Sequence, residues 1–379
     1  MDHWILVVFA YSWGVIAGAW GTEWTELTPY NYGAIFMFGA GSILSGRLGD
    51  LWGRRVMMLI FFFGMGLSCF LIALCTNPWQ IGAALTLMGA FASIYHPVGI
   101  PMLVQNAARP GFTIGVNGLA GNLGIAIAAG ISVYVATNHG WQSAFILPGL
   151  ICIAAGIAFW WLVPQESEAP AQRKPKLLDL PPGTMATVFA VMTVTAVTGS
   201  IIFNFTTNGN GELLRARAAA LAEDPALLAL MLFAVFALAS LAQLVVGKLI
   251  DRYPLKRLYL TIAGLQVPLF LLASQAEGIG LFFLVIVFML LVFGAIPFTD
   301  AMIVKYVDDR MRSRVTGLRL AIGFLVSSFA VALIGPAVKV AGFGAMLILL
   351  AAVAACSVVA IMFLPGNEPA LRRATEAAE

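Results

Sequence analysis

Long runs of apolar residues follow one another along most of the chain, and short stretches rich in Gly, Pro and charged residues separate them. A run of about 20 apolar residues forms a helix that can cross about 30 Å of bilayer hydrocarbon. The pattern predicts an all-α integral membrane protein with twelve transmembrane helices in two six-helix, pseudo-symmetric halves. The expected helices cover residues 4–22, 30–50, 56–76, 79–107, 113–136, 142–163, 184–206, 226–250, 257–275, 279–306, 314–338 and 342–364.

The composition agrees with a bilayer as the solvent. Of 379 residues, 61% are apolar and 10% are charged, and the mean hydropathy is +0.94. Soluble domains have about 45–50% apolar and about 25% charged residues. Twelve helices leave no room for an added soluble domain, so we expect the function to lie inside the bundle. The four cysteines lie in apolar segments at spacings that suit neither a disulfide framework nor a metal site, and we expect no metal and no cofactor.

The basic residues predict the orientation. All of the 21 Lys and Arg residues except Arg215, Arg217 and Lys339 fall in the expected tail and in loops after even-numbered helices, or beside these loops. Because cytoplasmic loops carry the excess of Lys and Arg, we expect a multi-pass inner-membrane protein with both termini in the cytoplasm.

Polar stretches divide the chain. Residues 164–183 are rich in proline and mixed charges, which predicts a flexible cytoplasmic linker. We therefore expect an N-terminal six-helix half over 1–163, the linker over 164–183, a C-terminal six-helix half over 184–364 and a cytoplasmic tail over 365–379.

A short charged motif occurs twice. The sequence GRLGDLWGRR runs from Gly46 to Arg55, and GKLIDRYPLKR runs from Gly247 to Arg257, at an offset of 201 positions. Within one residue, the same offset aligns Pro97 with Pro297. Like halves in a membrane bundle point to a transporter.

The first copy of this motif resembles the loop signature of the major facilitator superfamily, and a degenerate second copy is typical of that family. The resemblance implies a secondary transporter whose motif latches the cytoplasmic side. Asp50 would pair with a base such as Arg314 or Arg319; the alternative is that these charges only anchor helix ends at the lipid headgroups. The expected gating residues are Gly46, Asp50, Gly53, Arg54, Arg55, Asp251, Arg314 and Arg319.

Two signatures of proton-coupled drug exporters are missing. Leu85 stands where helix 4 of those exporters carries an arginine, and helix 5 has the spaced glycines but no Gly-Pro pair. The stretch from Tyr95 to Pro97 is similar to fosmidomycin-resistance-type exporters but does not decide the direction of transport.

In this family helices 1, 4, 7 and 10 line a central cavity, so polar and aromatic residues there and on neighbouring helices are candidate substrate contacts. Thr193, Ser200, Asn204 and Thr207 share one face of the expected helix 7. The alternative for each candidate is interhelical packing or hydrogen bonding. The candidates are Tyr11, Trp13, His96, Asn117, Asn122, Thr193, Ser200, Asn204, Gln243 and Phe298.

His96 and Asp300 are the titratable residues beside the aligned prolines, and either is a candidate to carry the coupling proton in place of the missing helix 4 arginine. The alternative is that His96 is a satisfied polar residue and that Asp300 reaches the interface or pairs with a loop base. Pro97 and Pro297 lack backbone donors, so they are the expected hinges of helices 4 and 10.

These features predict a secondary active transporter that moves a small neutral, zwitterionic or amphipathic organic solute by alternating access. Proton-coupled efflux, ion-coupled uptake and uniport remain alternatives. No Lys or Arg lies in the middle of an expected helix, which argues against phosphate esters and dicarboxylates. No nucleotide-binding motif surrounds Gly247 and Lys248, and an intramembrane enzyme is disfavoured because His96, Asp300 and Glu23 do not converge. The expected partners are the substrate, protons and lipid, without nucleic acid, and we expect a monomer.

Overall fold

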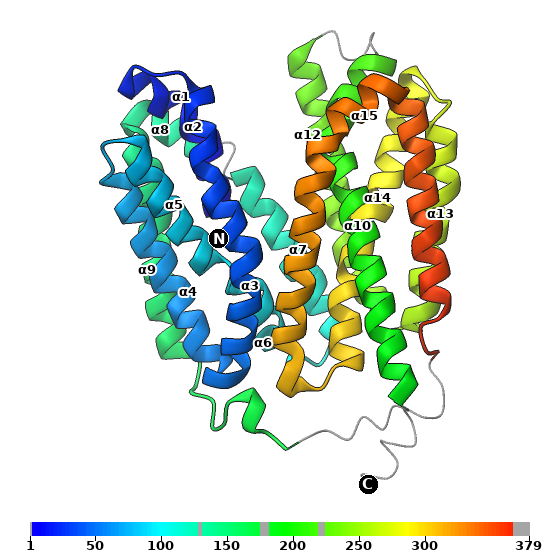
Figure 1. Ribbon diagram of the computed structural model, residues 1–379, viewed down its shortest axis with the longest axis horizontal. Coiled ribbons are helices and arrows are strands. Elements are labelled where there is room, and N and C mark those ends of the chain that lie inside the picture. The colour runs from blue at the N-terminus through cyan, green and yellow to red at the C-terminus, as the bar shows by residue number, and fades with distance from the viewer. Residues whose placement is uncertain (1, 128–130, 175–181, 219–223, 367–379) are drawn as a thin grey trace. The chain divides into compact units, whose positions relative to one another are not determined.

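The computed structural model describes residues 2–127, 131–174, 182–218 and 224–366, and these form helices and connecting turns with no strand among them. The main helices run side by side in each part of the chain (Figure 1). Their bounds are α1 Asp2–Trp20, α3 Tyr32–Trp52, α4 Arg54–Ala73, α5 Pro78–Ala92, α6 Ile100–Val104, α7 Pro110–Ile127, α8 Val133–His139, α9 Trp141–Leu162, α10 Pro182–Arg217, α12 Pro225–Ile250, α13 Leu255–Ala273, α14 Gly278–Tyr306 and α15 Arg312–Met362.

Short elements complete the description: α2 Trp24–Leu27, the 3₁₀ turns η1 Thr28–Asn31, η4 Pro170–Gln172 and η5 Asp309–Met311, and the π-helical turn η2 Tyr95–Gly99. Helix 4 of the sequence prediction therefore consists of α5, η2 and α6. Proline removes a backbone donor at Pro97, and the widened turn accommodates this loss.

Helices 11 and 12 of the prediction follow one another directly as α15, which is interrupted at Gly342. The backbone of Gly342 has φ 75° and ψ 165°, a conformation that L side chains rarely adopt and that glycine adopts freely. The break divides α15 into two helical segments. By length and apolar composition, nine helices in the described part of the chain qualify as membrane spans.

Helix α10 is longer than the sequence predicts, because it continues from the expected end near residue 206 to Arg217. The added turns bury Leu213 and Leu214 in a core shared with α12, α14 and α15. Leucine and glutamate are good helix formers, and burial of the two leucines stabilises the extension.

By spatial proximity the described chain forms two compact units. Unit 1 contains residues 1–106, 120–175 and 308–321, and unit 2 contains residues 107–119, 176–307 and 322–379. Helix α7 thus begins in unit 2 and continues in unit 1, and α15 begins in unit 1 and continues in unit 2. The contacts described below each lie within one unit.

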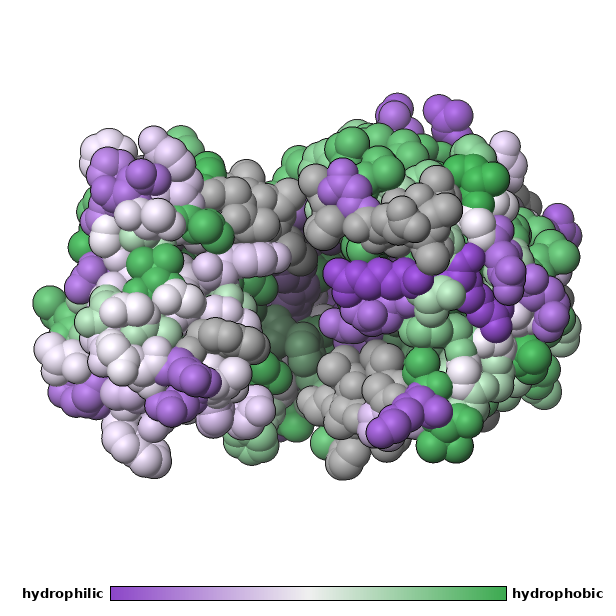
Figure 2. All heavy atoms as spheres, turned by 90° about the horizontal axis from the view of Figure 1, so that it is seen from above, coloured by the Kyte–Doolittle hydropathy of each residue, from purple (hydrophilic) through white to green (hydrophobic). Residues whose placement is uncertain are grey.

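The outer faces of the helices are apolar. Large hydrophobic side chains such as Leu44, Leu67, Trp161, Val245 and Phe283 are exposed. Figure 2, which looks onto the upper helix ends of Figure 1, shows hydrophilic residues among hydrophobic ones on these ends. Apolar flanks with polar ends are the surface that a bilayer requires.

Small residues let α3 and α5 pack closely in unit 1. A Cβ at Gly89 would lie 2.2 Å from the carbonyl oxygen of Ala34, and one at Gly33 would lie 2.0 Å from Oγ1 of Thr86. The hydroxyls of Ser45 and Ser93 are hydrogen-bonded at 2.9 Å on the same interface. Close backbone approach through small residues is a common way to pack membrane helices.

This packing predicts opposite effects for two glycine substitutions. Gly89→Ala introduces a clash with the α3 backbone and is expected to lower the free energy of unfolding by about 1–3 kcal/mol. Gly264→Ala on α13, where a Cβ would meet nothing within 4 Å, is the matched control and is expected to be neutral or stabilising by about 0.4–1 kcal/mol. Thermal unfolding of the purified variants in detergent measures both. An equal melting temperature for the two variants would contradict the packing argument.

Candidate functional site

The first copy of the repeated motif lies where α3 ends and α4 begins, in unit 1. Asp50 is completely buried at the end of α3. Its carboxylate accepts hydrogen bonds from the backbone amides of Ser313 at 3.2 Å and Arg314 at 3.1 Å. These amides belong to the first turn of α15, where backbone donors lack partners within the helix. Asp50 therefore caps α15 from a different part of the chain.

Arg314 also reaches Asp50 through its side chain, with Nε 3.1 Å from Oδ2. The ion pair predicted for Asp50 thus forms with Arg314, while Arg319 lies five positions further along α15. Gly46 makes this approach possible, because a Cβ there would lie 2.4 Å from the carbonyl oxygen of Ser313. On the facing helix, a Cβ at Gly317 would lie 2.1 Å from the carbonyl oxygen of Ser42.

Arg54 starts α4 and is buried, with 0% of its side chain exposed. Its guanidinium donates to Oδ1 of Asp309 at 2.9 Å, to the backbone oxygen of Asp309 at 2.7 Å and to Oε1 of Gln105 at 3.1 Å. A buried guanidinium needs this full set of acceptors because its desolvation is costly. Arg54 therefore connects the start of α4 with Gln105, which follows α6, and with Asp309 in η5.

Asp309 is the centre of a cluster of positive charges. Burial acts to raise the pKa of Asp309, but the positive charges of Arg54, Arg312 and Arg173 outweigh it and hold that pKa below its usual value. Arg312 lies 3.3 Å from the carboxylate, and Arg173 of the linker also pairs with it. Sequence reasoning missed Asp309 and Arg173, because neither is part of the repeated motif.

The described part of the linker is held against unit 1, although the sequence predicts a flexible segment. Arg173 pairs with Glu166 at 2.8 Å as well as with Asp309. Oε2 of Glu166 accepts a hydrogen bond of 3.0 Å from the backbone amide of Arg55, so it caps α4. Gly53, with φ 99°, connects α3 to α4 beside this carboxylate.

Arg55 points toward the end of α9. Its guanidinium donates to the carbonyl oxygens of Val163 at 2.7 Å and Trp160 at 2.8 Å. Carbonyls at the end of a helix carry partial negative charge, which favours a cation there.

The second copy of the motif repeats the capping contact in unit 2. Oδ1 of Asp251 accepts from the amide of Gly111 at 2.7 Å, and Oδ2 accepts from the amide of Phe112 at 2.8 Å. These amides open α7. Glycines again allow the approach, since a Cβ at Gly247 would lie 2.4 Å from the carbonyl oxygen of Gly111.

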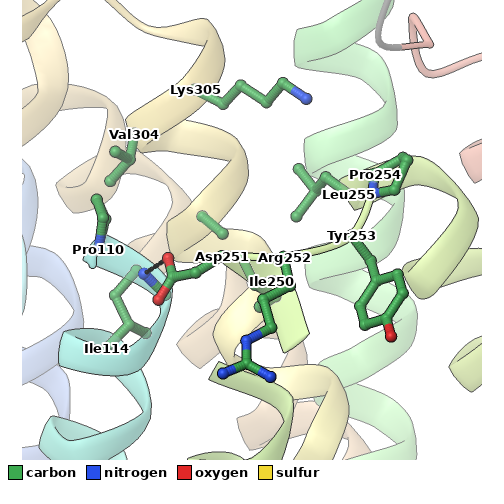
Figure 3. A pocket seen from close by; sticks show the side chains of 12 residues that line it. Pro110, Ile114, Ile250, Asp251, Arg252, Tyr253, Pro254, Leu255, Val304 and Lys305 are labelled. Carbon is green, nitrogen blue, oxygen red and sulfur yellow. Dashed lines mark hydrogen bonds between the residues drawn. The ribbon is translucent and has the colours of Figure 1, made fainter. Parts of the chain in front are cut away.

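A cavity of about 480 Å³ adjoins this second motif. Figure 3 shows Asp251 turned toward the start of α7, whereas Lys305 and Arg252 extend away from it in different directions. The cavity is lined by Pro110, Gly111, Ile114, Ile250, Asp251, Arg252, Tyr253, Pro254, Leu255, Ala301, Val304 and Lys305.

Several predicted cavity residues of unit 2 have local partners. Asn204 donates to the carbonyl of Ser200 at 2.9 Å, and Thr193, which is exposed, bonds back to Phe189. Phe298 is completely buried and stacks on Tyr259 with ring centroids 4.4 Å apart. The stacking gives Phe298 a packing role in this conformation.

Gln243 lies on α12 and is 2% exposed. Its side chain covers Gly118, where an added Cβ would overlap Oε1, and Gly115 faces the Gln243 backbone. Asn117 of α7 lies in the same unit and is half-buried. Asp300 of α14 is also in unit 2 and is 7% exposed. Sequence reasoning missed a buried hydrogen bond of 2.6 Å between Thr198 and Ser357 in this unit.

The predicted residues of unit 1 lie on α1, α7 and η2. Tyr11 is exposed, Trp13 packs edge-on against Phe9, and Asn122 is half-buried on α7. His96 lies in η2 beside Pro97, next to the ring of His3. The other predicted hinge, Pro297, lies inside the continuous helix α14. The aligned prolines therefore differ in local structure.

The family model described as Major Facilitator Superfamily matches residues 4–214 and, separately, residues 183–379. The chain therefore belongs to the major facilitator superfamily. The two matches agree with a fold of twelve transmembrane helices in two halves, and the chain is a multi-pass membrane protein.

Curated relatives are similar over part of their length. The gallate transporter of Pseudomonas putida is 24% identical over 159 residues, covering 41% of this chain and 35% of the relative. The multidrug resistance protein MdtG of Yersinia enterocolitica is 27% identical, covering 41% and 40%. The 4-hydroxybenzoate transporter PcaK of Pseudomonas aeruginosa is 25% identical, covering 39% and 34%. The chain thus spans less than half the length of these relatives, and two of the three are named as transporters.

Solved structures share the fold over nearly the whole chain. The proton:xylose symporter XylE has a TM-score of 0.76 at 12% identity, covering 97% of this chain and 94% of XylE. The transporter FucP has a TM-score of 0.71 at 11% identity, covering 96% and 100%. These similarities concern the fold.

The charge cluster predicts a pH-dependent contribution to stability. Asp309→Asn is expected to lower the free energy of unfolding by about 1–3 kcal/mol at neutral pH, because buried Arg54 loses its counter-charge. The pKa of Asp309 is lower in the folded protein than in the unfolded chain. Its ion pairs therefore stabilise fully above about pH 4 and lose their effect as the pH falls through the folded value.

Thermal unfolding of the parent and of Asp309→Asn between pH 8 and pH 3 measures the difference between their free energies of unfolding. It should be constant from pH 8 to pH 5 and shrink below pH 4. Glu277→Gln, at an exposed carboxylate, is the control and should change little. A difference that grows on acidification would contradict the assigned cause.

Proposed function

We propose that the protein is a secondary active transporter that carries a small organic solute across the inner membrane by alternating access. Membership of the major facilitator superfamily supports the class. The observation that carries the proposal is the paired capping contact, in which Asp50 holds the first turn of α15 and Asp251 holds the first turn of α7. Contacts between a carboxylate and a helix start can form and break without rebuilding a packed core.

Both termini lie in the cytoplasm in this proposal. The support is the distribution of Lys and Arg, which is strongly biased to the loops after even-numbered helices and to the tail. The two motif copies are then cytoplasmic, and the contacts of Asp50 and Asp251 act as latches on that side.

The substrate is an amphipathic aromatic solute. The helices expected from the sequence carry many aromatic residues and no Lys or Arg in their middle, which favours a solute with a large apolar part. Two relatives are named for gallate and 4-hydroxybenzoate, which are aromatic monocarboxylates, and a third for multidrug resistance. The proposed substrate contacts are Tyr11, Trp13, His96, Asn117, Asn122, Ser200, Asn204 and Gln243.

Protons drive the transport in this proposal, and the protein acts as a monomer. His96 and Asp300 are the proposed proton carriers, because each is a titratable group within a predominantly apolar helix segment. The alternatives are coupling to another ion and uniport. An inward proton gradient drives uptake if solute and proton move together and efflux if they move in opposite directions, so the sign of the solute-driven pH change distinguishes the two.

The proton prediction is tested in proteoliposomes. Addition of 4-hydroxybenzoate is expected to change the internal pH with the parent protein, and His96→Gln and Asp300→Asn are each expected to reduce this change at least about tenfold, since each removes a titratable group. A pH-sensitive dye reports the change. If the parent moves the solute without protons, or both variants keep full coupling, coupling through these groups is excluded.

The latch prediction compares two aspartates. Asp50→Asn is expected to reduce transport about tenfold at near-normal expression, because it loses both the ion pair with Arg314 and part of the cap of α15. Asp251→Asn is expected to have a smaller effect, since it loses no comparable ion pair and its amide oxygen can still accept one bond from α7. Uptake or efflux in sealed vesicles measures both; an unchanged rate for Asp50→Asn would refute the latch.

The hinge prediction concerns Pro97 and Pro297. Replacement by alanine restores a backbone donor and stiffens the helix. Pro97→Ala should slow turnover more than it changes substrate affinity, with a larger effect than Pro297→Ala, because only Pro97 lies in a π-helical turn. Turnover and affinity are measured separately in proteoliposomes. A loss of affinity alone would refute the hinge role.

A further inference from the structure

Two histidines from distant parts of the sequence lie side by side in unit 1. His3 is in the first turn of α1, and His96 is in the π-helical turn η2. Their ring centroids are 5.3 Å apart, with an angle of 39° between the planes. Each is half-buried. Sequence analysis singled out His96 alone, because His3 is close to the start of the chain and 93 positions away.

Aromatic side chains lie next to the histidine pair, which is His3 and His96. The ring of Phe38 lies 6.0 Å from that of His96 and is nearly perpendicular to it, and the ring of Tyr95 lies 5.4 Å away on another side. Phe61 contacts Tyr95 in turn, at 5.5 Å. Such rings can pack against the face of an aromatic solute.

Helix α7 leaves room for His3 by having glycine at the contact. A Cβ at Gly121 would lie 2.6 Å from Nδ1 of His3 and 2.9 Å from its Cε1. A Cβ at Gly124, one turn further, would contact the backbone of Trp4. The start of α1 is therefore seated on the glycine face of α7, and this fixes the His3 ring against His96.

The helices packed against η2 carry Arg47 and Asp50 at the end of α3 and Arg54 and Arg55 at the start of α4. Asp50 and Arg54 are bonded to α15 and η5, as described above. Tyr95, which is in ring contact with His96, is itself titratable.

Two imidazoles at this distance influence each other's charge. A proton on one ring opposes a proton on the other, because like charges about 5 Å apart repel strongly away from bulk water. A pair coupled in this way takes up its protons in two separate steps. Between the steps it carries one positive charge that either ring can present.

We propose that His3 and His96 form one proton-binding site whose single positive charge binds the carboxylate of an aromatic acid, with the ring of the acid against Phe38 and Tyr95. His3 is then a second residue of the coupling site. This inference rests on the proposed function for the identity of the solute, whereas the coupling between the two rings is a property of the protein alone.

The first experiment examines the pair without any solute. The chain has three histidines, so histidine-selective isotope labelling of the purified protein gives three imidazole signals in an NMR titration. The signals of His3 and His96 are expected to shift in two steps. His3→Gln should convert the His96 curve into a single step, since the neighbouring charge is gone.

His139 on α8 is exposed and provides the matched control. His139→Gln should remove one signal and leave the other two curves unchanged. If His3 and His96 titrate as independent single steps, and His3→Gln leaves the His96 curve in place, the pair is refuted. His3→Asn is the second variant in case His3→Gln does not fold, as judged by gel filtration and thermal unfolding.

The second experiment measures binding of 4-hydroxybenzoate and of its neutral methyl ester at pH 6 and pH 8 by calorimetry. The parent is expected to bind the acid about tenfold more tightly at pH 6, as a charge-assisted contact allows, and the ester equally at both values. His3→Gln and His96→Gln should each abolish the pH dependence for the acid, and His139→Gln should preserve it.

The outcomes separate the inference from the proposed function. Binding of the acid with no pH dependence in the parent refutes the charged pair and leaves the aromatic solute in place. Binding of neither acid nor ester refutes the aromatic solute, and with it carboxylate recognition by the pair. Pair-dependent binding of the acid together with two-step titration supports the proposal.

Discussion

The backbone amides in the first turn of a helix need hydrogen-bond acceptors from outside the helix, and the contacts around the repeated motif supply them. Backbone amides at a helix start have no acceptor within the helix, and burial without an acceptor is costly. In α15 the carboxylate of Asp50 meets this need, and in α7 the carboxylate of Asp251 does. Each aspartate lies at the end of a different helix, so a local requirement of one helix becomes a contact between distant parts of the chain.

Other features follow from this requirement. A carboxylate can reach a foreign backbone only if the helices approach closely, and Gly46, Gly317 and Gly247 provide the space. The buried Asp50 needs positive charge nearby, and Arg314 and Arg54 supply it. Arg54 in turn needs acceptors, which Asp309 and Gln105 supply. The linker enters the network through Arg173, whose ion pairs with Glu166 and Asp309 help to hold its first part in place.

The repeated motif was predictable from the sequence because its residues are contiguous and occur twice. Aspartate, glycines and arginines at fixed spacing identified the family and the ends of the helices, and apolar runs located the spans. The same approach predicted a partner for Asp50 among the basic residues of helix 11, and the structure has Asp50 paired with Arg314. The roles of these residues in transport stay predictions.

Contacts made by single residues far apart in the sequence could not be predicted. Arg173 lies in a segment whose prolines and mixed charges indicate a flexible linker, and nothing local reveals that Asp309 will meet it. His3 has no periodic pattern that relates it to His96. The extension of α10 to Arg217 was missed because polar residues interrupt the apolar run, although Leu213 and Leu214 supply the buried contacts that maintain the helix.

The two halves share a motif but differ in the helix that contains the aligned proline, which is formed by α5, η2 and α6 in the first half and by α14 in the second. This difference has a physical origin. Both helices contain a proline at aligned positions, yet α14 runs through Pro297 as a continuous helix while the chain widens into a π-helical turn at Pro97. A second proline, Pro101, follows Pro97 four residues later and removes another backbone donor, whereas α14 has no second proline after Pro297. Two missing donors one turn apart weaken the helix more than one. The widened turn η2 contains His96, so the least regular part of the segment formed by α5, η2 and α6 also has a titratable side chain.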